Sequence, residues 1–73
     1  MADLPVVSGA EAVRRFERAG WAVARRKGSH VMLTHRDARA TLSIPQHREL
    51  DSGLLRALVR AAGMTIEEFV NVG

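Results

Sequence analysis

Apolar residues recur with two different periods along this chain, and the changes of period divide it into helices and strands. The first helical pattern follows Ser8 and Glu11, which have the spacing of a capping box, so a helix is predicted to begin near Gly9. Gly20 can adopt the left-handed conformation that ends a helix. The residues expected on the apolar stripe of this helix are Ala10, Val13, Phe16 and Ala19.

The next part of the chain alternates between apolar and polar residues, which is the period of a β-strand. Three strands are predicted, over residues 21–27, 30–35 and 39–44, with turns at 28–29 and 36–38. Pro45 has no amide hydrogen to donate to a strand ladder, so the third strand is expected to end there. Trp21 is expected to be a core residue rather than a platform for stacking bases.

Helical periodicity returns after a loop over residues 46–50. Asp51 or Ser52 can cap the next helix, and Gly63 closes it. Its expected apolar face consists of Leu54, Leu55, Leu58, Val59 and Ala62. A second capping box over residues 65–68 opens a short last helix. That helix is expected to bury Ile66, Phe69 and Val70.

The predicted order of elements, αβββα(α), indicates an α+β fold in which helices cover one face of a three-stranded antiparallel sheet. With 73 residues and no repeats or linkers, we expect one domain over residues 1–73 with its core in 8–70. If Val31 and Leu33 face the helices, strand alternation sends His30 to the opposite, uncovered face. The other residues expected on that face are Arg26, Thr41 and Ser43. Arg25 and Arg26 cannot both lie there if the strand is regular.

The composition excludes several kinds of chemistry. The chain has no cysteine, so it has neither a disulfide framework, nor a thiolate zinc site, nor a cysteine nucleophile. It shows no secretory signal pattern and no apolar run near the roughly 20 residues that span a bilayer. We therefore expect a cytoplasmic protein that does not bind membranes.

Positive charge is concentrated in the middle of the sequence. Residues 14–60 hold all 11 Lys and Arg residues and have a net charge of +7, whereas the flanks have a net charge of −4. This asymmetry favours a polyanionic partner, whose binding weakens as salt rises. A solvated arginine-rich surface explains the same excess equally well.

The motif Lys27-Gly28-Ser29-His30 places a histidine after a basic run, at the end of a tight turn. Imidazole titrates near neutral pH, so His30 is a candidate proton shuttle beside a phosphate. The candidate phosphate-binding groups are Lys27, Arg26, and the backbone amides of Gly28 and Ser29.

Two residues of the loop after Pro45 are further candidates for binding a polyanionic partner, namely His47 and Arg48. His47 either binds phosphate or donates a proton, or it only shapes the loop. His35 is assigned no role. A metal site is disfavoured because His30, His35 and His47 lack ligand-like spacing and no acidic cluster accompanies them.

Five segments follow, in order and spacing, the pattern of the HicA (YcfA-like) toxin family, and the match runs from about Ser8 to Phe69. The segments are Gly20-Trp21, Arg26-Lys27-Gly28-Ser29-His30, Ile44-Pro45-Gln46-His47, Leu54-Leu55-Arg56-Ala57-Leu58 and Ala62-Gly63-Met64-Thr65-Ile66-Glu67-Glu68-Phe69. The chain departs from the family pattern at Leu54, where threonine is usual, and at Gln46, where a basic residue is common.

The resemblance implies a fold similar to the double-stranded-RNA-binding domain and a toxin that cleaves mRNA, with His30 as its catalytic histidine. It also implies a HicB-like antitoxin as partner. RNA carries its own nucleophile, the 2′-hydroxyl, so such cleavage needs no metal or other cofactor. The alternatives are a non-catalytic RNA-binding module and a domain that binds an acidic protein partner.

Overall fold

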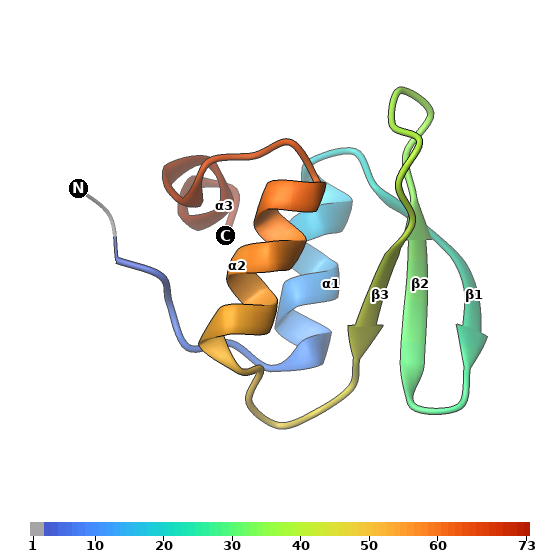
Figure 1. Ribbon diagram of the computed structural model, residues 1–73, viewed down its shortest axis with the longest axis horizontal. Helices are drawn as coiled ribbons and strands as arrows, with labels where there is room; N and C mark the ends of the chain where they lie inside the picture. Colours follow the sequence, from blue (N-terminus) through green and yellow to red (C-terminus); the bar gives the residue numbers. More distant parts are fainter. Residues whose placement is uncertain (1–2) are drawn as a thin grey trace.

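Three helices and one antiparallel sheet make up residues 3–73, which the computed structural model describes. The elements are α1 (Gly9–Arg18), β1 (Ala22–Lys27), β2 (His30–Thr34), β3 (Leu42–Pro45), α2 (Ser52–Ala61) and α3 (Ile66–Asn71). The strands lie in the order β1-β2-β3, so β1 and β3 are the two edges of the sheet, and β3 lies beside the helices (Figure 1). This arrangement confirms the predicted αβββα(α) order and the α+β class. None of the helices in this range is long and apolar enough to cross a membrane.

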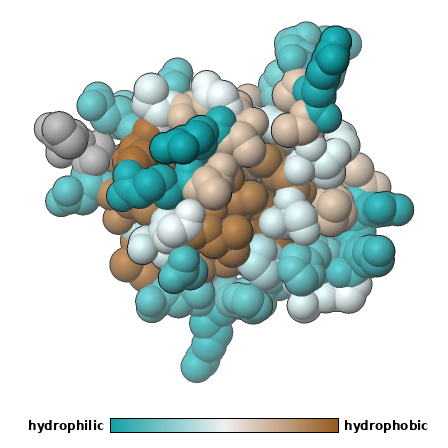
Figure 2. Space-filling model, in the orientation of Figure 1, coloured by the Kyte–Doolittle hydropathy of each residue, from teal (hydrophilic) through white to brown (hydrophobic). Residues whose placement is uncertain are grey.

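One cluster of apolar side chains joins the helices to the sheet. On β2, Val31 and Leu33 pair with Ile44 and Leu42 of β3, and all four are buried. The remaining members of the cluster are Val7, Ala12, Val13, Phe16, Trp21, Leu50, Leu55, Leu58, Val59 and Phe69. Apolar atoms remain visible across the middle of one face of the molecule, with hydrophilic residues around them (Figure 2).

Helix α1 begins where it was predicted and buries Val13 and Phe16 as expected, but the rest of its buried face differs. The Ser8 hydroxyl accepts a hydrogen bond from the Glu11 amide at 3.0 Å, as a cap should. Gly9 and Ala12 are buried, whereas Ala10, which was expected in the stripe, is exposed. The reason is the close approach of α1 to β3, where a Cβ at Gly9 would overlap the Pro45 carbonyl oxygen. That contact fixes the rotation of the helix.

The capping residues predicted for α2 and α3 are confirmed. The Asp51 carboxylate accepts from the Leu54 amide at 3.2 Å, and Gly63 takes a φ of +73° after the end of α2. Thr65 and Glu68 form both bonds of the capping box, at 2.8 and 3.1 Å. The predicted apolar faces are divided between buried and half-buried residues. Leu55, Leu58, Val59 and Phe69 are buried, and Leu54, Ala62, Ile66 and Val70 are half-buried.

All three strands are shorter than predicted, and β2 ends at Thr34 rather than at residue 35. β1 begins at Ala22, after a buried Trp21 whose ring lies 5.3 Å from that of His35. The His35 Nδ1 atom accepts from the Asp37 amide at 3.0 Å, which holds the turn after β2. The third strand starts only at Leu42, so the expected strand residues 39–41 lie in the loop and are exposed.

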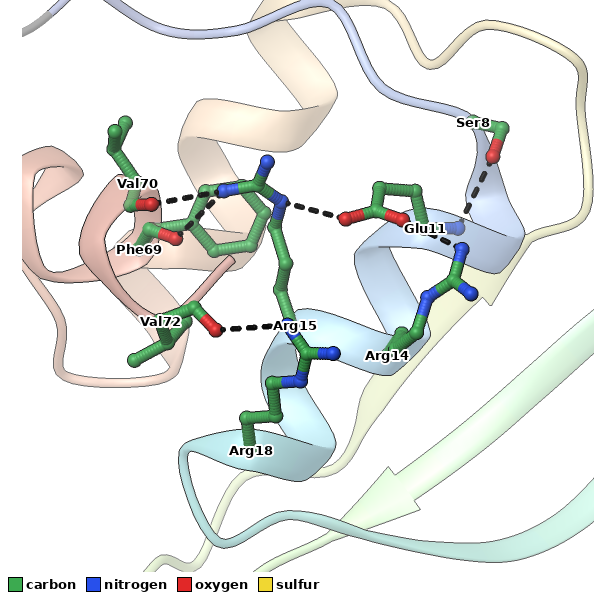
Figure 3. A network of polar contacts seen from close by, with 8 residues as sticks. All are labelled: Ser8, Glu11, Arg14, Arg15, Arg18, Phe69, Val70 and Val72. Atoms are coloured by element: carbon green, nitrogen blue, oxygen red, sulfur yellow. Dashed lines mark hydrogen bonds and ion pairs between the residues drawn. The ribbon is translucent and has the colours of Figure 1, made fainter.

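Two arginines of α1 bind the C-terminal end of α3 (Figure 3). Arg15 donates from Nη1 to the carbonyl oxygens of Phe69 and Val70, both at 3.1 Å, and Arg18 donates to Val72 at 3.3 Å. The Arg15 guanidinium also lies over the Phe69 ring, 5.4 Å from its centre. Carbonyls in the last turn of a helix lack their usual backbone partners, and these bonds supply donors to them; the Val70 carbonyl also accepts from the Gly73 backbone N–H at 3.3 Å. Part of the basic face of α1 is therefore used within the chain.

Candidate functional site

A two-residue turn places Lys27 directly opposite His30. Gly28 has a φ of +60°, whereas the φ of Ser29 is negative. No non-glycine residue in 3–73 has a positive φ. A positive φ at only the first central residue is the type II′ pattern, which suits the twist of a β-hairpin. Lys27 and His30 are the last pair of the β1–β2 ladder, and both are exposed. Paired residues of this kind project from the same face of a sheet.

The pairing of β1 with β2 is not regular. Val23 pairs with Leu33 and Arg25 pairs with Met32, so Ala24 is an extra residue between them, forming a β-bulge. The bulge reverses the alternation of every following residue in β1. As a result, side chains 25 and 27 share the face of His30.

The expectation that Arg26 shares the face of His30 is therefore wrong. Arg26 pairs with Val31, whose side chain is buried on the opposite face of the sheet. Arg25 occupies the position on the His30 face that was expected for Arg26. The sequence contains no glycine near Ala24 that would have indicated a bulge.

A shallow hollow of about 360 Å³ opens on the face of His30. Its lining residues are Arg25, Lys27, His30, Met32 and Ser43. Ser43 was expected on this face, and its pairing with Met32 confirms that position. Thr41 was expected here as well, but it is exposed in the loop before β3. The prediction that His30 projects from the exposed face, away from the buried Val31, is confirmed.

Within residues 3–73, no ion pair neutralises the positive charges of the hollow. Among residues 3–73, the ion pairs are those of Glu11 with Arg14 and Arg15, all three on α1. Arg25 and Lys27 make no side-chain hydrogen bond with any described residue. Uncompensated cations in a concave surface raise the local concentration of anions. The hollow thus has the shape and charge to hold a phosphate.

The loop over residues 46–50 is fastened beside the hairpin turn. The backbone N–H of Gln46 donates to the Ser29 carbonyl at 2.7 Å, and the backbone N–H of Gly9 donates to the His47 carbonyl at 2.9 Å. In Figure 1 this loop and the β1–β2 turn lie at the same end of the molecule. The side chains of His47 and Arg48 are exposed, and neither lines the hollow.

The donors around the hollow suit an anion rather than a metal ion. Guanidinium, ammonium, imidazole, hydroxyl and thioether groups line it, without a carboxylate. Across the part of the chain that the structure describes, no three His, Cys, Asp or Glu side chains come together.

Comparison with known families assigns the chain to one family. The family model for the HicA toxin of bacterial toxin–antitoxin systems matches residues 9–64, from the start of α1 to the residues before α3. This chain belongs to the HicA toxin family. The protein is thus the toxin of a toxin–antitoxin system, and the family implies an antitoxin as its partner. No curated protein matches the HicA chain.

Proposed function

We propose that this HicA toxin is a metal-independent endoribonuclease that cleaves mRNA, with His30 transferring a proton as general acid or general base. The observation that carries the proposal is the exposed His30 in a hollow whose other charged groups are Arg25 and Lys27. A proton shuttle and uncompensated cations on one surface are the groups that RNA cleavage needs.

The reaction uses a nucleophile that RNA already contains. The 2′-hydroxyl oxygen attacks the adjacent phosphorus while the bond from phosphorus to the 5′-oxygen breaks, leaving a 2′,3′-cyclic phosphate and a 5′-hydroxyl. The 2′-oxygen must lose a proton and the 5′-oxygen must gain one. His30 performs one of these two transfers, which typically contributes 10²–10⁴-fold to a rate.

Lys27 is assigned to the reacting phosphate because it lies directly across the ladder from His30. Negative charge grows on the phosphoryl oxygens in the transition state, and a nearby ammonium group stabilises it. The amides of Gly28 and Ser29 at the turn are further donors. His47 and Arg48 are assigned to RNA outside the hollow, since their loop is bonded to the turn.

The partner that we propose is a HicB-like antitoxin. The family match supports an antitoxin partner, and an mRNA substrate would place both proteins in the cytoplasm. A protein that neutralises this toxin has to prevent RNA from reaching the hollow, so its contact surface is expected to complement positive charge.

The test compares the full-length wild type with His30→Ala and with His35→Ala as a matched histidine control. Growth after induction and cleavage of purified mRNA in EDTA are measured, and circular dichroism checks folding. We expect His30→Ala to lose at least about 100-fold of the cleavage rate, and His35→Ala to keep it. Equal cleavage by wild type and a folded His30→Ala would remove His30 from the mechanism.

The same cations also support a second function, an RNA-binding module without catalysis. That function predicts salt-sensitive RNA binding that does not depend on His30, and no product after long incubation. Multiple-turnover cleavage in the experiment above would exclude it.

A further inference from the structure

The hollow has two ends with different chemistry. Lys27 and His30 are paired across the sheet and form one row of side chains on this face. Two residues farther along the strands, Arg25, Met32 and Ser43 are paired and form a second row on the same face. Residues two apart in a strand are separated by roughly 6.6 Å. This separation is comparable to the distance between consecutive phosphates along an extended RNA strand. A strand lying in the hollow would therefore place neighbouring nucleotides on neighbouring rows.

We propose that Arg25, Met32 and Ser43 form a subsite for the nucleotide adjacent to the cleaved linkage, with Arg25 binding the phosphate of that nucleotide. The proposal rests on the proposed function, because it takes the Lys27–His30 row as the place of cleavage. It assigns to the second row a substrate-binding role that is separate from proton transfer.

The side chains of the second row match the parts of a nucleotide. The Arg25 guanidinium presents a planar fork of donors that binds phosphate in a bidentate manner, which the ammonium of Lys27 cannot do. Met32 is half-buried, and its adaptable thioether side chain offers an apolar surface for a flat base. The Ser43 hydroxyl can donate and accept, so it can bind the edge of a base or a ribose hydroxyl.

The bulge supplies the matched control for this subsite. Arg25 and Arg26 are neighbours in sequence, have the same side chain and are both exposed on the edge strand β1. They differ in the face on which they lie, since Arg25 pairs with Met32 and Arg26 pairs with the buried Val31. Loss of either guanidinium removes the same charge. A difference in cleavage kinetics between the two variants therefore results from the face of the sheet on which each arginine lies.

The first experiment measures kcat and KM for cleavage of a short oligoribonucleotide by full-length wild type, Arg25→Ala, Arg26→Ala and Arg25→Lys. We expect Arg25→Ala to raise KM at least about tenfold and to change kcat less than about threefold, because it loses substrate binding. Arg26→Ala is expected to stay within about twofold of wild type, and Arg25→Lys to recover part of the loss. Equal KM values for Arg25→Ala and Arg26→Ala would overturn the subsite.

The second experiment places the lost contact on the substrate. A neutral methylphosphonate replaces the phosphate on the 5′ side or on the 3′ side of the cleaved linkage. We expect one of the two replacements to lower kcat/KM of the wild type about tenfold and to leave that of Arg25→Ala nearly unchanged, the signature of a shared contact. Equal sensitivity of both proteins to both replacements would contradict the assignment of Arg25.

The outcomes separate the two proposals. Cleavage by the wild type together with identical behaviour of Arg25→Ala and Arg26→Ala removes the subsite and leaves the nuclease standing. Absence of cleavage by the wild type removes the proposed function and the subsite with it.

Discussion

The arginines of α1 and the cations of the β1–β2 hairpin have similar chemistry and different surroundings. Arg15 and Arg18 donate to backbone carbonyls at the end of α3, and Arg14 and Arg15 pair with Glu11. Arg25 and Lys27 have no side-chain partner in the described range, 3–73, and line a hollow. A guanidinium that already bonds to the chain must break those bonds to bind an anion. Arg25 and Lys27 can bind an anion without first breaking a bond to the chain.

The difference also divides stability from function. The Arg15 side chain is only 17% exposed and lies over the Phe69 ring, so its bonds form in a partly desolvated place where they are stronger. All residues of β1 are exposed, and changes there cost little packing. We therefore expect substitutions around α3 to change the free energy of unfolding, and substitutions in the hairpin to change activity.

The largest effect is expected from Phe69→Ala. This side chain is fully buried, and its ring lies 5.1 Å from that of Phe16, so its loss leaves a cavity under α3. Such truncations cost about 3–5 kcal/mol. Urea denaturation measures the loss. A change in the free energy of unfolding below about 1 kcal/mol would show that α3 contributes little to the fold. The control is Arg25→Ala on the exposed strand β1, which is expected to stay within about 0.5 kcal/mol of wild type.

The next effect is that of Arg15→Met, which keeps an apolar stem and removes the donors. The carbonyls of Phe69 and Val70 then lose a charged donor, at a cost of about 1.5–3 kcal/mol. Arg14→Met is the matched control, because Arg14 makes only an exposed ion pair, which contributes little to stability. Equal losses for both variants, measured by urea denaturation, would remove the distinction between the two arginines.

Lys27→Met tests the hairpin side of the comparison. We expect the rate of RNA cleavage to fall at least about tenfold, because one cation beside the reacting phosphate is lost. The free energy of unfolding is expected to stay within about 0.5 kcal/mol of wild type, since Lys27 is exposed. Unchanged cleavage would separate Lys27 from the reaction.

The smallest effect is a dependence of stability on pH at Glu11. Hydrogen bonding to Arg14, with a contribution from Arg15, lowers the pKa of Glu11 below its ordinary value of 4.5. A lowered folded pKa means that this stabilisation is present above the unfolded pKa and is lost as pH falls through the folded pKa. Glu11→Gln should therefore lower the Tm near neutral pH and lose this effect in acid. A Tm difference that stays constant with pH would refute the assignment.

The sequence predicted the features whose signals are local. Ser8, Asp51 and Thr65 cap the helices as predicted, because capping is decided within one turn of the chain. The exposed position of His30 was also predicted, since β2 is regular and alternates from the buried residues Val31 and Leu33.

The features that the sequence did not predict depend on contacts between distant segments or on the backbone. The face of Arg25 depends on the bulge at Ala24, which no residue type marks. The stripe of α1 depends on the approach of Gly9 to Pro45. The bonds from Arg15 to α3 join residues 54 and 55 positions apart, beyond the reach of any local pattern.

The extra residue at Ala24 separates β1 into two halves, and the face on which side chains lie in one half is set independently of the other half. The first half is tied to the interior through Trp21, and the second half is tied to the turn through the pair of Lys27 and His30. We expect a repacking of the interior near Trp21 to be absorbed at the bulge without re-aiming the hairpin turn. Mutational drift inside the molecule can thus proceed while the surface around Lys27 and His30 stays constant.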